Sequence, residues 1–528
     1  MSGRLVGGQL GRIRAAQLPF LTYTSSTSTS PCRGFEDASA AGQWDTHWEE
    51  FLESVHVVLR KYAPLIYLFT ALPVVLFQVF FTPPFQTPDA PNNFFRVYQI
   101  SNGTLIGSRR GNSSGGQVND AMIKTAQLFN YIPFHYDHKI SASVMTRAAK
   151  YAWRTGGGRG HYVFASFPNT SVYPPLAYVP QVIGTLIGRS MNLSILATYR
   201  LDLLLVSLCA LTLTFLALRV DSTLTPVIYV CATLPMVTCL YAAMEPDALL
   251  ISVGLLLAAL LEKHAHNETG RAKWWPLYLA VFIMFLAIQK PPYIALLALL
   301  FLPSLVVSAS YALMRRVLFA IIPLGMTCAW VIYAKMTAWV TINPAGSALG
   351  SHFSFVATHP VAFLHIVWNS INGGAKGYIM QLIGVLGWLD ARFSPGYYVL
   401  ALTALAMAAL LYILSAHPMR KADWCLLFIA ISGSALMIFF SLYSTWSPVR
   451  PESIAGVQGR YFLPILPLSF MLLYPLKRNA RSMAVKMSAK YAIATKYAQS
   501  GIYVFLYLLF PLISTVATVS LIMHRYYL

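Results

Sequence analysis

The sequence predicts an all-α polytopic membrane protein, and three observations lead to this fold class. Of the 528 residues, 57% are hydrophobic and 11% are charged, whereas a water-soluble globular protein has about a quarter of its residues charged. The mean hydropathy of +0.58 is high for the same reason. Apolar runs of roughly 17 to 25 residues, the length that crosses a bilayer as a helix, recur along the chain.

Eleven apolar runs are expected to be transmembrane helices. A twelfth run, 172–188, is excluded because it is short, contains three prolines and ends in the polar turn GRSMN. Counting this run as a span would also place the basic segment 477–500 on the outside. The expected spans are about 63–81, 195–218, 223–243, 247–262, 274–289, 293–310, 316–336, 396–414, 424–444, 461–476 and 501–523.

The basic residues predict the orientation of these spans. The formal charge of +20 could suggest a nucleic-acid partner, but most Lys and Arg residues lie in short segments between apolar runs, where they set topology. With the N-terminus in the cytoplasm, the short inner segments carry more Lys and Arg than the short outer ones, as the positive-inside rule requires. We therefore expect membrane lipid, and no nucleic acid, as a partner.

This topology divides the chain into six segments. The tail lacks the apolar core of a signal peptide and is rich in Ser and Thr, so we expect it to be largely disordered and the first span to be an uncleaved anchor. Amphipathic stretches in the first loop (APNNFFRVYQI and YPPLAYVPQVIGTLIG) predict helices on the membrane surface. The segments are the cytoplasmic tail 1–62, the first span 63–81, the extracytoplasmic loop 82–194, spans two to seven in 195–336, the second extracytoplasmic loop 337–395, and spans eight to eleven in 396–523.

Ionisable residues concentrate at the outer ends of the expected spans. Helices that return to one membrane face bring residues that are distant in sequence together, and a charge beside lipid is unfavourable unless it is paired or solvated. These residues are therefore candidates for a functional site. They are Asp89, Glu245, Asp247, Lys290, Asp390, Arg450, Glu452 and Arg460.

Structural alternatives exist for several of these residues. Asp247 begins a helix, where a carboxylate caps free N–H groups. Asp390 and Arg392 could form a surface ion pair, and Arg460 could reach toward lipid headgroups. Asp89, between two prolines, could be an ordinary turn residue.

Six motifs, in order, resemble a family of membrane proteins. They are PFQTPDAPNNFFRVYQIS, NTSVYPPLAYVPQ, MEPDALL, QKPPYIAL, GWLDARF and GVQGRYFLPILPL, and they cover roughly residues 80 to 470. The layout is similar to the GT-C superfamily of integral-membrane glycosyltransferases, which includes protein mannosyltransferases and the aminoarabinose transferases that modify lipid A. The motifs resemble most closely a bacterial polytopic family of unknown function placed near that superfamily.

The first motif departs from this family pattern. The family often has an acidic pair and a histidine there, whereas this chain has Ala90 after Asp89, with Asn92 and Asn93 nearby. The second carboxylate and the imidazole are missing, which removes two metal ligands, while Asp89 itself remains.

The resemblance implies an inverting glycosyltransferase. Such an enzyme would move a sugar from a polyprenyl-phosphate-linked donor to a glycan, lipid or protein acceptor at the outer face of the bacterial inner membrane. Asp89 matches the position of the general base, and Arg460 and Lys290 are candidates for binding the phosphate that leaves.

Further residues complete the expected site. Glu245, Asp247 and Asp390 would orient the acceptor or a metal, and Arg96, Tyr173 and Tyr461 would line the substrate site. A divalent cation, Mg²⁺ or Mn²⁺, could be held by Asp89 and Asp247. Two other classes stay open, a lipid or glycan transporter or flippase, and a non-catalytic membrane scaffold.

Overall fold

The structure is a computed structural model that describes residues 37–153, 161–266, 275–303, 312–340, 348–415, 417, 419–476 and 498–528. The chain divides into a unit of residues 1–50 and a unit of residues 51–528, and the account below concerns the second unit. Most of the predicted tail and the basic inner segment 477–496 lie outside the described residues.

Within these residues, seven helical stretches are long and apolar enough to cross a membrane. The predicted class, a mostly helical membrane protein, is confirmed. Five stretches belong to the helices α1 (Asp37–Phe81), α6 (Ile195–Arg219), α11 (Ala312–Thr337), α14 (Pro395–Ser415) and α15 (Lys421–Trp446). The sixth combines η4 (Gly459–Ile465) with α16 (Leu466–Met471), and the seventh combines a π-helical turn η5 (Phe505–Leu509) with α19 (Phe510–Tyr526).

The other four expected spans are helical but are not among these seven stretches. The run 223–243, expected as one helix, is two: α7 (Thr225–Thr233) and α8 (Pro235–Tyr241). Leu234 is extended because the ring of the following Pro235 disfavours helical backbone there. The run 293–310 begins as a 3₁₀ helix, η2 (Pro291–Phe301), and the remaining two are α9 (Asp247–His266) and α10 (Trp275–Gln289).

The first long loop is a folded layer of helices around a small sheet. Three antiparallel strands in the order β1-β2-β3 form this sheet, which sequence analysis did not predict. Gly115 and Gly116 pair with Ser166 and Ala165 in adjacent strands. The elements are α2 (Ala90–Ser101), β1 (Ser108–Arg110), β2 (Ser113–Asn119), α3 (Asp120–Gln127), α4 (Ala142–Ala149), β3 (Tyr162–Ser166), η1 (Leu176–Tyr178) and α5 (Val179–Ser190).

The two helices expected on the membrane surface differ from each other. The prediction is wrong for α2, because its residues from Asn93 to Gln99 are all buried and the helix packs inside the folded layer. Helix α5 exposes Val179, Ile183 and Leu186 on one side, as a surface helix would. Its 12 residues are too few to cross a bilayer, in agreement with the exclusion of 172–188 from the spans.

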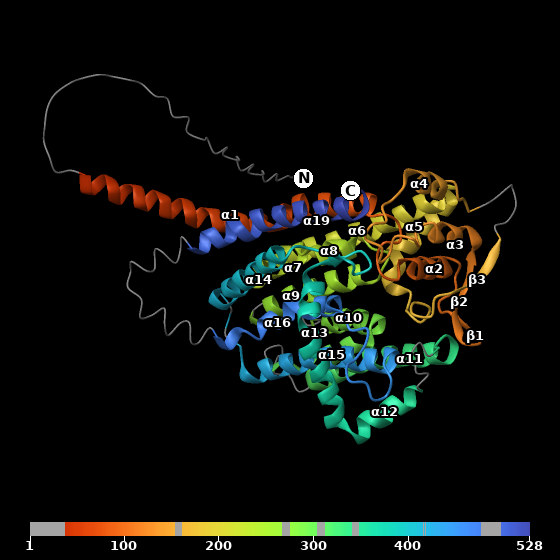
Figure 1. Cartoon of the computed structure of the whole chain (residues 1–528). Helices are drawn as coiled ribbons and strands as arrows, with labels where there is room; N and C mark the ends of the chain where they lie inside the picture. The colour runs from red at the N-terminus through yellow and green to blue at the C-terminus, as the bar shows by residue number, and fades with distance from the viewer. Residues whose placement is uncertain are drawn as a thin grey trace, which may run out of the picture. The chain divides into compact units, whose positions relative to one another are not determined.

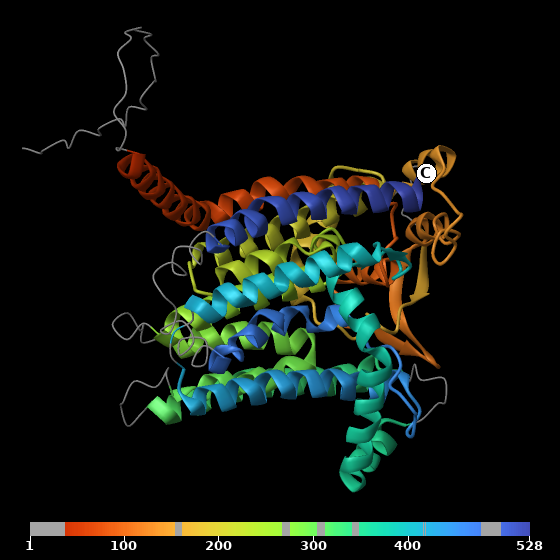
Figure 2. The ribbon, with the colours of Figure 1, turned by 60° about the vertical axis from the view of Figure 1, so that its left-hand side comes forward.

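Helices α1 and α19 lie side by side, and the folded layer gathers at the end of the bundle where both helices end (Figures 1 and 2). The hydroxyl of Tyr527 donates to the carbonyl of Phe81 across this pair at 2.9 Å. The second long loop contains α12 (Leu349–Thr358), α13 (Pro360–Ile383) and a short antiparallel pair, β4 (Val385–Leu386) and β5 (Ala391–Arg392). Both figures show α13 running across the long helices.

Helix α13 approaches η4 without side chains between the two backbones. A Cβ atom added at Gly459 would lie 1.9 Å from the carbonyl oxygen of Tyr378. The side-chain oxygen of Gln381 accepts a hydrogen bond from the Gly459 N–H at 2.9 Å. Glycine at 459 is therefore required by close approach, and this contact fixes the start of η4.

We expect Gly459→Ala to lower stability. The added methyl group meets backbone that cannot rotate away, and overpacking of this kind destabilises by about 1–3 kcal/mol. Thermal unfolding of the purified protein in detergent measures the effect. Gly377→Ala is the control, since Gly377 lies on α13 with nothing within 4 Å of an added Cβ; equal melting temperatures for the two variants would contradict the assignment.

Candidate functional site

Asp89 lies in the turn that leads from α1 into α2. Its φ of +59° is unusual for a residue other than glycine, and Phe85 in the same turn has φ +65°. Its carboxylate oxygen Oδ1 accepts a hydrogen bond from Asn169 Nδ2 at 2.5 Å, and Asn169 in turn accepts from Asn92 Nδ2 at 2.9 Å. Non-glycine residues held at positive φ are uncommon and often occur at functional sites.

Two ion pairs join three other turns of the chain beside this one, since Glu245 and Asp247 lie in the same turn. Arg460 Nη1 lies 2.5 Å from Glu245 Oε2, and Lys290 Nζ lies 2.5 Å from Asp247 Oδ1. The side chains of Arg460 and Glu245 are 4% and 5% exposed, and that of Lys290 is 18% exposed. Lys290 is thus the more accessible of the two cations.

The elements explain how distant residues meet. Glu245 stands between α8 and α9, Asp247 begins α9, Lys290 connects α10 to η2, and Arg460 lies in the first turn of η4. Each residue is at the end of a helix, at the place where the chain turns. We call Asp89, Glu245, Asp247, Lys290 and Arg460 the charged cluster.

Electrostatic interactions connect Asp89 to the two ion pairs. Burial raises the pKa of Asp89, while Arg460 and the hydrogen bond from Asn169 lower it; Asp247 and Lys290 also contribute. Within the described part of the chain, Asp89 forms no ion pair of its own. The charged cluster therefore contains one carboxylate that no cation neutralises directly.

Burial acts on Glu245 as well. It raises the pKa of Glu245 to about 7, and the adjacent Arg460 lowers it. Gln181 donates to the backbone carbonyl of Glu245 at 3.4 Å. The other carboxylate oxygen of Glu245, Oε1, and the amide oxygen of Gln181 are buried and have no hydrogen-bond partner among the described residues, so they can accept hydrogen bonds from a ligand or water.

Two predicted lining residues, Tyr461 and Tyr173, lie at the charged cluster. Lys290 Nζ stands 4.7 Å from the centre of the Tyr461 ring, and the Arg460 guanidinium stands 5.4 Å from it. Burial raises the pKa of Tyr173, and the charges of Asp89, Asp247 and Arg460 reach it as well. The cluster therefore has aromatic walls.

Arg96, the third predicted lining residue, has a different place. It is fully buried and donates hydrogen bonds to the backbone carbonyls of Tyr173 and Leu105 and to the side chain of Gln99. Burial lowers the pKa of Arg96 to about 10, which still leaves the side chain charged at neutral pH. Its contacts hold α2 against the chain before η1, so Arg96 supports the backbone that carries Tyr173.

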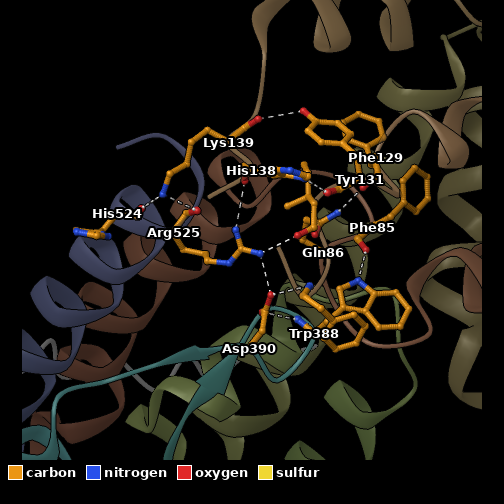
Figure 3. Close-up of polar contacts among 12 residues, drawn as sticks. Phe85, Gln86, Phe129, Tyr131, His138, Lys139, Trp388, Asp390, His524 and Arg525 are labelled. Atoms are coloured by element: carbon orange, nitrogen blue, oxygen red, sulfur yellow. Dashed lines mark hydrogen bonds and ion pairs between the residues drawn. The ribbon is translucent and has the colours of Figure 1, made fainter. Parts of the chain in front are cut away.

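Asp390 belongs to a second group of polar contacts (Figure 3). Its carboxylate pairs with Arg525 Nη2 at 2.8 Å rather than with Arg392, the partner considered from sequence. It also accepts from the backbone N–H groups of Trp388 and Phe134 at 3.1 and 3.2 Å. These contacts make Asp390 an anchor for its loop, and the structure does not bring it into the charged cluster.

Trp388 connects this second group to the turn of Asp89. Its indole Nε1–H donates to the carbonyl of Phe85 at 2.9 Å, as Figure 3 shows. The N–H of Phe85 donates to the Tyr199 hydroxyl at 3.3 Å. Both ends of the Phe85 backbone unit are thus held by side chains of other segments, four residues before Asp89.

A divalent cation does not fit the described residues. No group of three or more His, Cys, Asp or Glu side chains among them could hold a metal ion. Asp247 is engaged by Lys290, and Asn169 occupies one oxygen of Asp89. The absence of a second carboxylate at Ala90 agrees with this, and we derive no step through a metal.

Sequence analysis missed several polar residues of the site. Asn169 and Gln181 lie within the quoted motif NTSVYPPLAYVPQ, but nothing in their spacing indicated contacts with Asp89 or Glu245. Arg525, the partner of Asp390, was not among the predicted site residues. The sequence signal that could have identified Asn169 and Gln181 is a polar side chain inside a largely apolar motif.

The comparison with protein families agrees with the extent of the motifs. The model described as "Predicted membrane protein (DUF2142)" matches residues 72–469. The chain belongs to this family. No curated protein and no solved structure matches the chain. All five residues of the charged cluster fall inside the DUF2142 match, whereas Arg525 falls after it.

We expect Trp388→Phe to loosen the turn that carries Asp89. The substitution removes the indole N–H and keeps a smaller aromatic ring. Amide hydrogen exchange of residues 84–90, followed by mass spectrometry, should become several-fold faster. Arg392→Gln is the control, since Arg392 is an exposed residue of the same loop; unchanged exchange in a folded Trp388→Phe protein would refute the link.

Proposed function

We propose that this DUF2142 protein is an inverting glycosyltransferase that uses a polyprenyl-phosphate-linked sugar at the extracytoplasmic membrane face. The observation that supports it is the charged cluster, in which a carboxylate without a cation partner lies beside two cations at the ends of apolar helices. A lipid-linked donor requires this arrangement, because its tail stays in the bilayer while its sugar stands at the surface.

Asp89 is the general base in this proposal. The acceptor hydroxyl gives its proton to Asp89 as the acceptor oxygen attacks the anomeric carbon. The bond from that carbon to the phosphate oxygen breaks, and its electron pair leaves on polyprenyl phosphate. Attack from the side opposite to the leaving group inverts the anomeric centre.

Lys290 and Arg460 stabilise the phosphate that leaves. Charge-assisted hydrogen bonds to it strengthen as negative charge develops. Lys290 is the principal contact because its side chain is more exposed than that of Arg460. Asp247 holds the Lys290 side chain in place, and Glu245 holds the Arg460 side chain. These two cationic side chains therefore lose less conformational entropy when the donor binds.

Sugar hydroxyl groups fit the unpartnered oxygens near Arg460. Glu245 Oε1 and Gln181 Oε1 are acceptors without donors, and a sugar or acceptor hydroxyl can donate to either. Tyr173 and Tyr461 supply aromatic surface next to them. These contacts orient the substrate and take no part in bond breaking.

Asp89→Asn is expected to lower turnover by about 10²–10⁴-fold, the usual contribution of a general base. Membranes containing the protein are given polyprenyl phosphates that carry different hexoses, and released polyprenyl phosphate is measured by mass spectrometry. Asp120→Asn is the control, because Asp120 lies in the same loop and pairs with the exposed Lys124.

A measurement of polyprenyl phosphate binding distinguishes a residue that acts in catalysis from a residue that binds the donor. Asp89→Asn should retain this binding, while Lys290→Met should weaken it by roughly 10- to 100-fold, the value of one charge-assisted hydrogen bond. A transporter would move the lipid without releasing the sugar, and a scaffold would tolerate both changes. Either result would overturn the proposal.

The pH dependence of turnover should follow the ionisation of Asp89. A base must be deprotonated to act, so the rate falls as the pH drops through the pKa of Asp89. Burial raises this pKa, and the acid limb should therefore lie above the ordinary aspartate value of about 3.9. Turnover measured at a series of pH values checks this, and a limb at or below the ordinary value would contradict it.

A further inference from the structure

Helix α13 has three distinct faces. One face packs into the protein through Phe363, Ile366, Val367 and Ser370, next to Tyr443 of α15. The rest of the helix surface is exposed along much of its length. This exposed surface is not uniform, and its two halves differ in chemistry.

Val367 lies at one edge of the buried face of α13. The exposed residues next to that edge are apolar. These residues form an apolar stripe within an arc of about 80°, given about 100° of rotation per residue. Val361, Leu364 and Trp368 are 78%, 52% and 63% exposed. The members of the apolar stripe are Val361, Leu364, Trp368, Ile371 and Ile379.

The other half of the exposed surface is a polar stripe. His365, Asn369, Asn372 and Lys376 are all exposed, and they occupy the adjoining arc of about 60° at the same rotation per residue. A helix that packs on protein with one face and exposes one apolar and one polar face suits the interface between membrane and water. A helix in aqueous solvent has no reason to expose the apolar stripe.

We propose that the hairpin α12–α13 lies in the interface between membrane and water, with its apolar stripe in lipid and its polar stripe in water. This inference does not depend on the enzymatic activity proposed above. It concerns a surface that the charged cluster does not use.

Three observations favour lipid over a protein partner. The hairpin continues the surface of a membrane helix, since Phe353 of α12 packs edge-on against Phe440 of α15 with ring centres 5.0 Å apart. Helix α13 runs across the long helices, which sets it near the plane of a membrane that they cross (Figures 1 and 2). Trp368 is of the residue type enriched at membrane interfaces.

The charge of the hairpin also suits a lipid surface. Between residues 348 and 383, Lys376 is the single Lys, Arg, Asp or Glu. No carboxylate is present to repel anionic headgroups, and the lysine stands on the polar stripe, from which it can reach them. The apolar side chains exposed on α15, such as Phe428 and Ile429, extend the same lipid-facing surface.

Fluorescent labels on single cysteines test the proposal in the full chain. The exposed Cys209, Cys328 and Cys425, together with Cys32, are replaced by alanine. Buried Cys231 and Cys239 stay. An environment-sensitive fluorophore is attached at Leu364→Cys or Trp368→Cys for the apolar stripe, and at Asn369→Cys or Asn372→Cys for the polar stripe.

The labelled proteins are placed in nanodiscs of phosphatidylethanolamine and phosphatidylglycerol. Phe80→Cys, at a 44% exposed position near the end of the α1 span, is the lipid reference, and Lys124→Cys on the exposed side of α3 is the water reference. The quenchers are iodide in water and a nitroxide lipid labelled near the top of its acyl chain.

Labels on the apolar stripe should be quenched by the nitroxide lipid like the lipid reference and lose most of their iodide quenching. Labels on the polar stripe should show several-fold stronger iodide quenching. Equal iodide quenching of both stripes would overturn the proposal, because the hairpin would then stand in water. Shielding of the apolar stripe from both quenchers, with cross-linking to another protein, would overturn it in favour of a protein partner.

Discussion

The pairing of buried charges at the ends of apolar helices is the constraint on which the rest of the structure depends. Moving an unpaired ion from water into a low-dielectric interior costs several kcal/mol, and removing one partner of a buried pair is strongly destabilising. Arg460 and Glu245 are almost completely buried and therefore require each other. Their pair, with that of Lys290 and Asp247, links three chain turns, because Glu245 and Asp247 belong to the same turn.

The turn of Asp89 is held differently, by neutral groups. Asn169 contacts its carboxylate, and Trp388 and Tyr199 hold the Phe85 peptide unit. Two residues of this turn have positive φ, a conformation that persists only where surrounding contacts over-determine it. The carboxylate of Asp89 thus contacts an amide side chain and, among the described residues, forms no ion pair with Arg or Lys.

Much of this organisation could be predicted from sequence, and the failures have physical causes. The long apolar runs, and the position of Asp89, Glu245, Asp247, Lys290 and Arg460 at the ends of helices, follow from hydropathy and helix length. The pairing of Arg460 with Glu245 could not be predicted, because it depends on helix packing. Arg96 was expected to line the substrate site, yet backbone carbonyls accept its hydrogen bonds inside the folded layer. Asp390 was assigned by its motif, but its partner Arg525 lies over a hundred residues later in the chain.

The direct contact of the α13 backbone with Gly459 has a mechanical consequence. Since no side chain separates them, no flexible layer absorbs a shift of one against the other, and Arg460 is the next residue. A displacement of α13 would therefore have to move the backbone at Gly459 and, with it, Arg460. With α13 in the interface, as proposed above, a change in bilayer thickness would reach the guanidinium of Arg460 through this contact.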